Sequence, residues 1–148
     1  MMMFSENYSR QTALASVEKA LDPHLTDAEL ASLARSDEVK VRAAVAERPA
    51  TPLTTLLKLA SDEAAIVRAG VARNERPDMP ADLHDQLAHD KSTSVVFALI
   101  DNPAVSDALI GRLARHFHKE YGSAARARLA SKGGAARVLG RLGITTTG

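Results

Sequence analysis

A Leu-Ala step recurs along the chain at nearly constant intervals, and this recurrence constrains the fold more than any other feature. The step occurs with spacings of 26, 28 and 26 residues, at Leu33-Ala34, Leu59-Ala60, Leu87-Ala88 and Leu113-Ala114. A period of this length is typical of helical repeat arrays. In such arrays, each unit buries its apolar face against its neighbours.

Each unit predicts two short helices joined by a polar corner. In the second unit, we expect Thr51 to cap a helix that has Pro52 in its first turn and runs through LTTLLKLA. The corner SDE follows, and a second helix covers AIVRAGVAR until the next prolines end it. Thr26 and Glu29 predict a capping box at the aligned place in the first unit, and Ser106 predicts a cap in the last. Helices this short are not stable alone, so the units must stack.

The second helices carry apolar side chains at matching positions. The inward pairs that we expect are Val41 and Val45, Val67 and Val71, and Val95 and Leu99. A small residue accompanies each pair, at Ala44, Gly70 and Ala98. Small residues at a helix contact allow neighbouring backbones to approach closely, so these positions predict tight stacking of one second helix on the next.

The pattern VRxxVAxxPxTPxxxLxxLAxD resembles the leucine-rich repeat variant family over roughly residues 12–115. The resemblance implies a right-handed superhelix of alternating α- and 3₁₀-like helices. We therefore expect an all-α, right-handed solenoid of about four helix pairs over residues 12–118. An N-terminal arm over residues 1–11 precedes it, and a basic helical cap over 119–148, with disordered last residues, follows it. Some family members carry a cysteine-bound iron–sulfur cluster, which is not carried over because this chain has no cysteine.

The absence of cysteine also excludes disulfides, zinc–thiolate sites and cysteine nucleophiles. The sequence contains neither a nucleophile elbow nor a glycine-rich phosphate loop after a predicted strand. His116 and His118 are two residues apart, so on a helix they point to different sides and cannot share a metal. We therefore predict no catalytic residue, no cofactor and no metal.

The N-terminal residues MMMFSENYSRQT contain no apolar run of signal-peptide length. No segment approaches the roughly 20 consecutive apolar residues that a membrane helix needs. These two observations predict a cytoplasmic protein without a membrane span.

Arg42 and Arg68 hold equivalent repeat positions, and two interpretations of them are open. They form either a row that binds an anion, or a structural ladder that pairs with acidic corner residues such as Asp62 and Asp90. The third unit has Val96 and Phe97 where the other units have arginine and alanine. We predict a non-catalytic scaffold that binds another macromolecule, in the first place a protein, and whose oligomeric state is open. The candidate contacts are second-helix positions expected to face solvent: Lys40, Arg42, Ala43, Arg68, Ala69, Val96 and Phe97.

Charge is unevenly distributed along the chain. Residues 1–109 hold 11 Lys and Arg against 17 Asp and Glu, whereas residues 110–148 hold 8 against 1. The alternative function is therefore nucleic-acid binding, through phosphate contacts of Arg126, Arg128, Lys132, Arg137 and Arg141. In this region we expect helices over 107–118, 123–131 and 135–142, with a break at 132–134. Apolar residues such as Leu129 and Leu139 predict that 119–142 pack back on the third unit as its cap.

Overall fold

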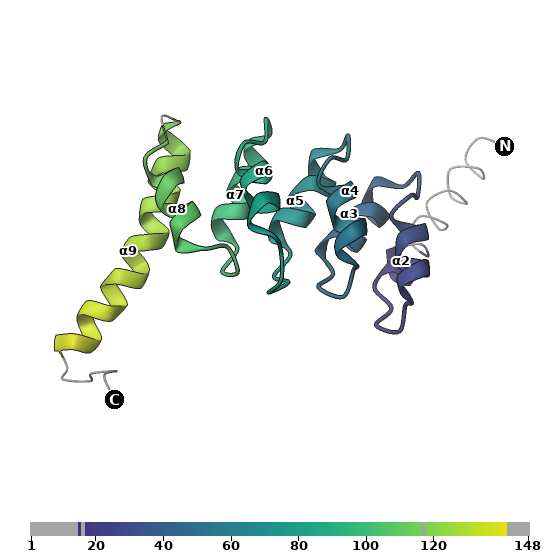
Figure 1. Cartoon of the computed structure of the whole chain (residues 1–148), viewed down its shortest axis with the longest axis horizontal. Helices are drawn as coiled ribbons and strands as arrows, with labels where there is room; N and C mark the ends of the chain where they lie inside the picture. The colour runs from purple at the N-terminus through teal and green to yellow at the C-terminus, as the bar shows by residue number, and fades with distance from the viewer. Residues whose placement is uncertain (1–14, 16, 117, 142–148) are drawn as a thin grey trace, which may run out of the picture. The chain divides into compact units, whose positions relative to one another are not determined.

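The computed structural model describes residues 15, 17–116 and 118–141, and they form helices joined by turns (Figure 1). None of these described residues lies in a β-strand, so the all-α prediction is confirmed. The expected 3₁₀-like character of alternate helices is wrong for the described residues, whose helices are all α-helices. The predicted N-terminal arm and the predicted disorder at the C-terminal end lie outside the described residues. The right-handed winding and the number of repeats stay predictions.

The chain divides into two compact units, Met1–Ala104 and Val105–Gly148. The division falls before the last Leu-Ala step, whereas the sequence placed the end of the repeats at residue 118. The helices of the first unit are α2 (Asp27–Leu33), α3 (Val39–Glu47), α4 (Leu53–Leu59), α5 (Ala65–Arg73), α6 (Ala81–Ala88) and α7 (Thr93–Asp101). The second unit contains α8 (Asp107–Ala114) and α9 (Lys119–Arg141).

Two of the predicted helix caps are confirmed and one is wrong. The side-chain oxygen of Thr26 accepts the N–H of Glu29 at the start of α2, and that of Ser106 accepts the N–H of Leu109 at the start of α8. Pro52 itself is the residue that precedes α4, so Thr51 does not cap that helix. The buried Thr51 hydroxyl instead donates to the carbonyl of Val45, 2.7 Å away, near the end of α3. Thr51 therefore satisfies a helix C-terminus rather than an N-terminus.

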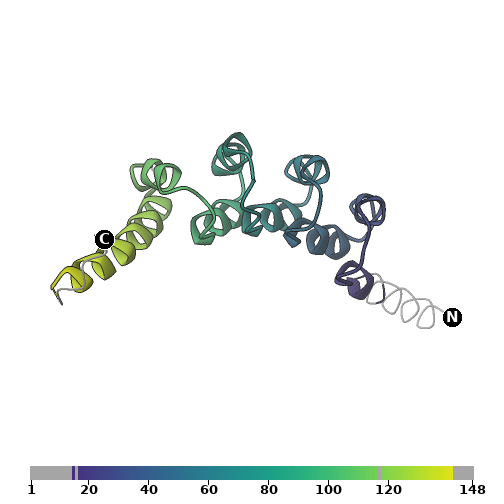
Figure 2. The same cartoon turned by 60° about the horizontal axis from the view of Figure 1, so that its bottom comes forward.

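The second helices of the first unit stack directly on one another, α3 on α5 and α5 on α7. Figure 2 shows them in a row, with α2, α4 and α6 standing off to one side of it. The predicted inward pairs are confirmed, because all six residues are fully buried: Val41, Val45, Val67, Val71, Val95 and Leu99. Of the small residues beside them, Gly70 and Ala98 are buried, whereas Ala44 is half-buried. Gly70 lies so close to α3 that a Cβ atom there would come within 2.9 Å of the Ala46 Cβ. The row of second helices is therefore the core of this unit.

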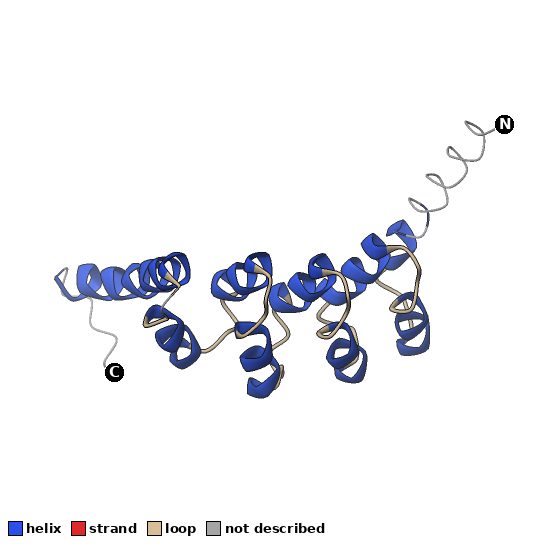
Figure 3. Ribbon diagram, turned by 90° about the horizontal axis from the view of Figure 1, so that it is seen from above, coloured by secondary structure: helices blue, strands red, loops and turns tan. Residues whose placement is uncertain are grey.

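In the second unit, α9 packs against α8 and continues without interruption to Arg141 (Figure 3). The predicted break at 132–134 is therefore wrong. The helix predicted over 107–118 is also too long, since α8 ends at Ala114. A glycine costs a helix interior about 1 kcal/mol but does not end it, whereas a proline does. Leu129 stands where Pro49 and Pro103 follow earlier second helices, so nothing stops α9 at the usual place.

Candidate functional site

The first rung of the arginine row joins α3 to the corner after α4. Arg42 Nε and Nη2 donate to the two carboxylate oxygens of Asp62 at 2.9 and 3.1 Å. The third guanidinium nitrogen, Nη1, donates to the carbonyl of Ser36 at 2.8 Å. This is a two-pronged, charge-assisted pair, which is the strongest class of side-chain hydrogen bond in proteins.

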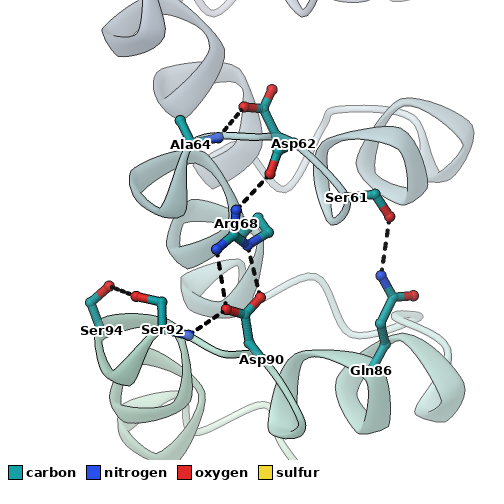
Figure 4. Close-up of polar contacts among 8 residues, drawn as sticks. All are labelled: Ser61, Asp62, Ala64, Arg68, Gln86, Asp90, Ser92 and Ser94. Carbon is teal, nitrogen blue, oxygen red and sulfur yellow. Dashed lines mark hydrogen bonds and ion pairs between the residues drawn. The ribbon is translucent and has the colours of Figure 1, made fainter.

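The second rung repeats this geometry one helix pair further along. Arg68 Nε and Nη2 donate to Asp90 at 2.8 and 3.2 Å, and Nη1 donates to the carbonyl of Asp62 at 2.7 Å (Figure 4). Arg42 and Arg68 are only 9% and 7% exposed. Both side chains therefore act inside the array, and the interpretation of the row as a structural ladder is confirmed.

The corner position of the ladder is held by Ser36, Asp62 and Asp90, each three residues after its Leu-Ala leucine. A side-chain oxygen of each accepts the backbone N–H two residues later, at 3.1, 2.9 and 2.8 Å respectively. The neighbouring Asp37 is exposed and is not part of this set. The same bond thus shapes each corner and, in the two carboxylate cases, also aims an oxygen at an arginine.

Ionisation of the first rung is reinforced by its geometry. Burial by itself would raise the pKa of Asp62, but the hydrogen bonds from Arg42 and from the Ala64 N–H outweigh it, so the pKa is lowered. The hydrogen bond to Asp62 likewise raises the pKa of Arg42 against the opposing effect of burial. Both groups therefore stay charged at neutral pH, as a buried pair requires.

The predicted exposure of most partner-contact candidates is wrong. Ala43, Ala69 and Val96 are buried together with the two arginines, and Phe97 is half-buried. The reason in α3 and α5 is the stacking of second helices, since the Ala43 carbonyl and the Ala46 side chain face Gly70 of the next helix. Among the seven candidates, Lys40 is the one that the structure leaves exposed.

A second polar ladder was not predicted from the sequence. The buried Asn74 amide donates to the carbonyls of Ala46 and Arg48, both at 2.9 Å. One helix pair later, the Asn102 amide donates to the carbonyls of Ala72 and Asn74, both at 2.8 Å. Each asparagine oxygen also accepts the N–H two residues on, from Arg76 and Ala104 respectively.

This asparagine ladder satisfies the carbonyls left open at the ends of second helices. Arg48 holds the same register at the end of α3, and its Nη1 donates to the carbonyl of Ala20 at 2.6 Å. The signal in the sequence was the asparagine at matching positions in RNERP and IDNP.

The basic candidates of the second unit all lie on α9, and two of them have structural partners. Arg126 Nη1 donates to the carbonyl of Ala114 at 2.7 Å, and Arg128 Nη2 donates to that of Val105 at 2.9 Å. Lys132, Arg137 and Arg141 belong to the same continuous helix backbone, and their side chains lie outside the described part of the structure. The helix therefore carries all five charges, of which two contact the unit itself.

Aromatic rings gather where α8 turns into α9. The rings of His118 and Tyr121 stack with centroids 4.0 Å apart, and His116 lies 5.5 Å from Tyr121. His116 Nδ1 accepts the N–H of His118 at 3.0 Å, the same corner bond that Asp62 and Asp90 make. Across the described residues, no three His, Asp or Glu side chains gather as a metal-ligand set.

A different surface remains exposed on the first unit. We define the corner edge as Val39, Lys40, Leu57 and Ile66, which lie where first helices pass through the polar corners into second helices. Leu57 is in the last turn of α4 and Ile66 in the first turn of α5, and each is 48% exposed. Val39 begins α3, which stacks on α5. The exposed acids Asp37, Glu38 and Glu63 flank these residues in sequence.

Within the described part of the chain, no helix is both long enough and apolar enough to cross a membrane. Comparison with curated proteins and with solved structures finds no match. Residues 39–64, which cover α3, α4 and the following corner, match the family described as leucine rich repeat variant. The resemblance read from the sequence is thereby confirmed over residues 39–64.

Proposed function

We propose that this chain is a non-catalytic, cytoplasmic helical-repeat scaffold that binds another macromolecule, in the first place a protein, through the corner edge. The observation that carries the proposal is the contrast between the two kinds of surface in the first unit. The repeat arginines and asparagines form hydrogen bonds within the array. The corner edge instead exposes Leu57 and Ile66 to solvent.

Single exposed aliphatic side chains are common on protein surfaces. The corner edge differs because its aliphatic residues lie at the same turn of two successive helix pairs, with exposed acids next to them in the sequence. An apolar centre with a charged rim is the usual anatomy of a protein interface. A basic or neutral protein surface with aliphatic side chains suits this edge best.

The test is affinity purification of the full chain with quantitative comparison of the recovered proteins. The Leu57→Asp, Ile66→Asp double variant is expected to lose at least tenfold of a specific partner, because it places two charges in the apolar centre. Leu21→Asp is the matched control, since Leu21 is an exposed aliphatic residue outside the corner edge. Equal recovery by the wild type and the double variant, at equal thermal midpoints, contradicts the proposal.

The second candidate is nucleic-acid binding through the second unit. Residues 105–148 hold 8 Lys and Arg against 2 Asp and Glu. The continuity of α9 favours this candidate, because it keeps Lys132, Arg137 and Arg141 on one helix. Phosphate contacts release counterions, so binding to duplex DNA or single-stranded RNA is expected to weaken by at least tenfold between about 50 and 200 mM salt.

Fluorescence anisotropy with labelled DNA and RNA measures this directly. Arg137→Ala, Arg141→Ala is the test variant, and it is expected to weaken binding without changing the preference for sequence. Lys40→Ala, Lys58→Ala is the control, because it removes two positive charges from the first unit. Absence of binding at low salt removes this candidate and leaves the scaffold proposal untouched.

A further inference from the structure

His84 occupies a core position that aliphatic residues hold in the other helix pairs. It stands three residues before its Leu-Ala leucine, and the equivalents in the other units are Leu30, Leu56 and Ile110. These three are fully buried, and His84 on α6 is only 7% exposed. A titratable ring thus replaces a branched aliphatic side chain in the third helix pair.

The imidazole is poorly suited to this position once it carries a proton. Its Nε2 is buried without a hydrogen-bond partner among the described residues. Burial lowers the pKa of His84 from its ordinary value of 6.5, because the charged ring would lose its hydration. A buried ring without an acceptor for a second N–H is stable only while it is neutral.

The charged groups around α6 do not offset this cost, since burial is the cause that shifts the pKa of His84. Asp82 and Asp85 lie on α6 itself, and His89 follows it. On α5, which packs against α6, Arg68 and Arg73 are paired with Asp90 and Glu47. On α7, the other neighbour, the exposed Asp101 lies at the last position. Lys58 is on α4, whose corner contacts α6 through the Ser61–Gln86 hydrogen bond.

We infer that the third helix pair, α6 and α7, is a pH-sensitive element of the array, in which a proton on His84 loosens α6 from α5 and α7. Below about pH 6.5 the unfolded or locally opened chain binds a proton at this histidine, whereas the packed chain binds it less well. The stability of this pair is therefore fully present above pH 6.5 and is lost as the pH falls toward the lower value of the packed state. This loosening would remove the rigid surface that the array offers to a bound partner.

The test compares the wild type with His84→Leu, which restores the residue type of the equivalent positions. Urea unfolding of the full chain is followed from pH 7.5 to pH 5.0. One extra proton taken up on unfolding changes the unfolding equilibrium constant by up to tenfold per pH unit. The wild type is expected to show a dependence on pH below 6.5 that exceeds that of His84→Leu by several-fold.

His24→Gln is the matched control, because His24 is exposed, and it is expected to keep the wild-type dependence. Hydrogen exchange separates local from global opening. Amides of α6 and α7 are expected to gain more exchange on acidification than those of α3, after correction for intrinsic rates.

Equal pH dependence in the wild type and His84→Leu overturns the inference. An NMR titration of folded wild type in which His84 protonates at or above pH 6.5 also overturns it. If His84→Leu does not fold, His84→Gln replaces it, because an amide keeps the polarity of the ring without titrating. These outcomes do not depend on any partner, so they are separate from the test of the proposed function.

Discussion

The two units fill the same repeat positions with different chemistry. In the first unit, Arg68 reaches Asp90 and buries a charged pair, whereas the second unit has Gly122 and His116 in the registers of arginine and aspartate. Gly122 lies close to the carbonyls of Ala114 and His116, and Arg126 donates to Ala114 from the following turn. The arginine–aspartate pairs thus join one helix pair to the next within the first unit. In the second unit, the Arg126 hydrogen bond instead joins α8 and α9 within a single pair.

The ends of the second helices differ as well. In the first unit, α5 and α7 stop at asparagines whose amides satisfy the carbonyls of the preceding pair. In the second unit, Arg128 has the same register, and α9 continues past it. The ends of α5 and α7 thus coincide with an asparagine that has a proline nearby, whereas the long helix α9 has neither residue in this register.

Arg68→Ala tests whether burial makes the ladder of the first unit important for stability. Removing the arginine leaves Asp90 nearly buried without its counter-charge, so we expect the free energy of unfolding to fall by about 3–5 kcal/mol in urea denaturation. Arg73→Ala is the control, because its pair with Glu47 is about half exposed, and it should cost under about 1 kcal/mol. Similar losses for the two variants would show that burial of the ladder does not matter.

Leu129→Pro tests why α9 is long. Proline at this position copies Pro49 and Pro103, and it costs a helix interior about 3 kcal/mol, so the helix should end near Arg128. Circular dichroism is expected to show lost helical signal in this variant and little change in Leu129→Ala. Unchanged helicity in the proline variant would mean that tertiary contacts, and not the missing proline, keep α9 continuous.

Asn74→Ala tests the asparagine ladder. The variant leaves the carbonyls of Ala46 and Arg48 without their donor, and we expect a loss of about 2 kcal/mol in the free energy of unfolding. The matched amide is Gln86, which is exposed and bonds to Ser61 at 3.3 Å. Gln86→Ala should change the stability by less than about 0.5 kcal/mol. A comparable effect of the two substitutions would argue against a buried ladder.

The smallest expected effects have opposite signs in the two units. Gly70→Ala pushes a methyl group to 2.9 Å from Ala46 and 3.1 Å from the Ala43 carbonyl, so we expect a loss of about 1–2 kcal/mol. Gly111→Ala in α8 meets nothing within 4 Å and should gain about 0.5–1 kcal/mol from helix propensity. Thermal unfolding of both variants measures the difference. A gain at Gly70 would show that the stacking of α3 and α5 is looser than the structure has it.

Much of the candidate site was open to prediction because a repeat makes its partners visible. Arg42 and Arg68 recur at equivalent positions, and an acid follows each in the corner of the next helix pair. This pattern is why the ladder interpretation succeeded. The exposure of Ala43, Ala69 and Val96 was predicted wrongly, because helical periodicity ranks the faces of one helix but does not say how many of them neighbours cover. The aliphatic residues of the corner edge were missed for the same reason, since Leu57 and Ile66 look like core residues until their exposure is known.

Sequence alone predicts the all-helical class, the repeat register, the caps at Thr26 and Ser106 and the inward valines of the second helices. These follow from local backbone preferences and from a hydrophobic period that each unit repeats. Packing in three dimensions is what buries the arginines, brings Asn74 and Asn102 to the helix ends of the preceding pair, and places His84 in the core with an unpartnered nitrogen. The physical reason is that burial and hydrogen-bond partners depend on how closely the helix pairs stack, which a one-dimensional pattern of residues does not contain.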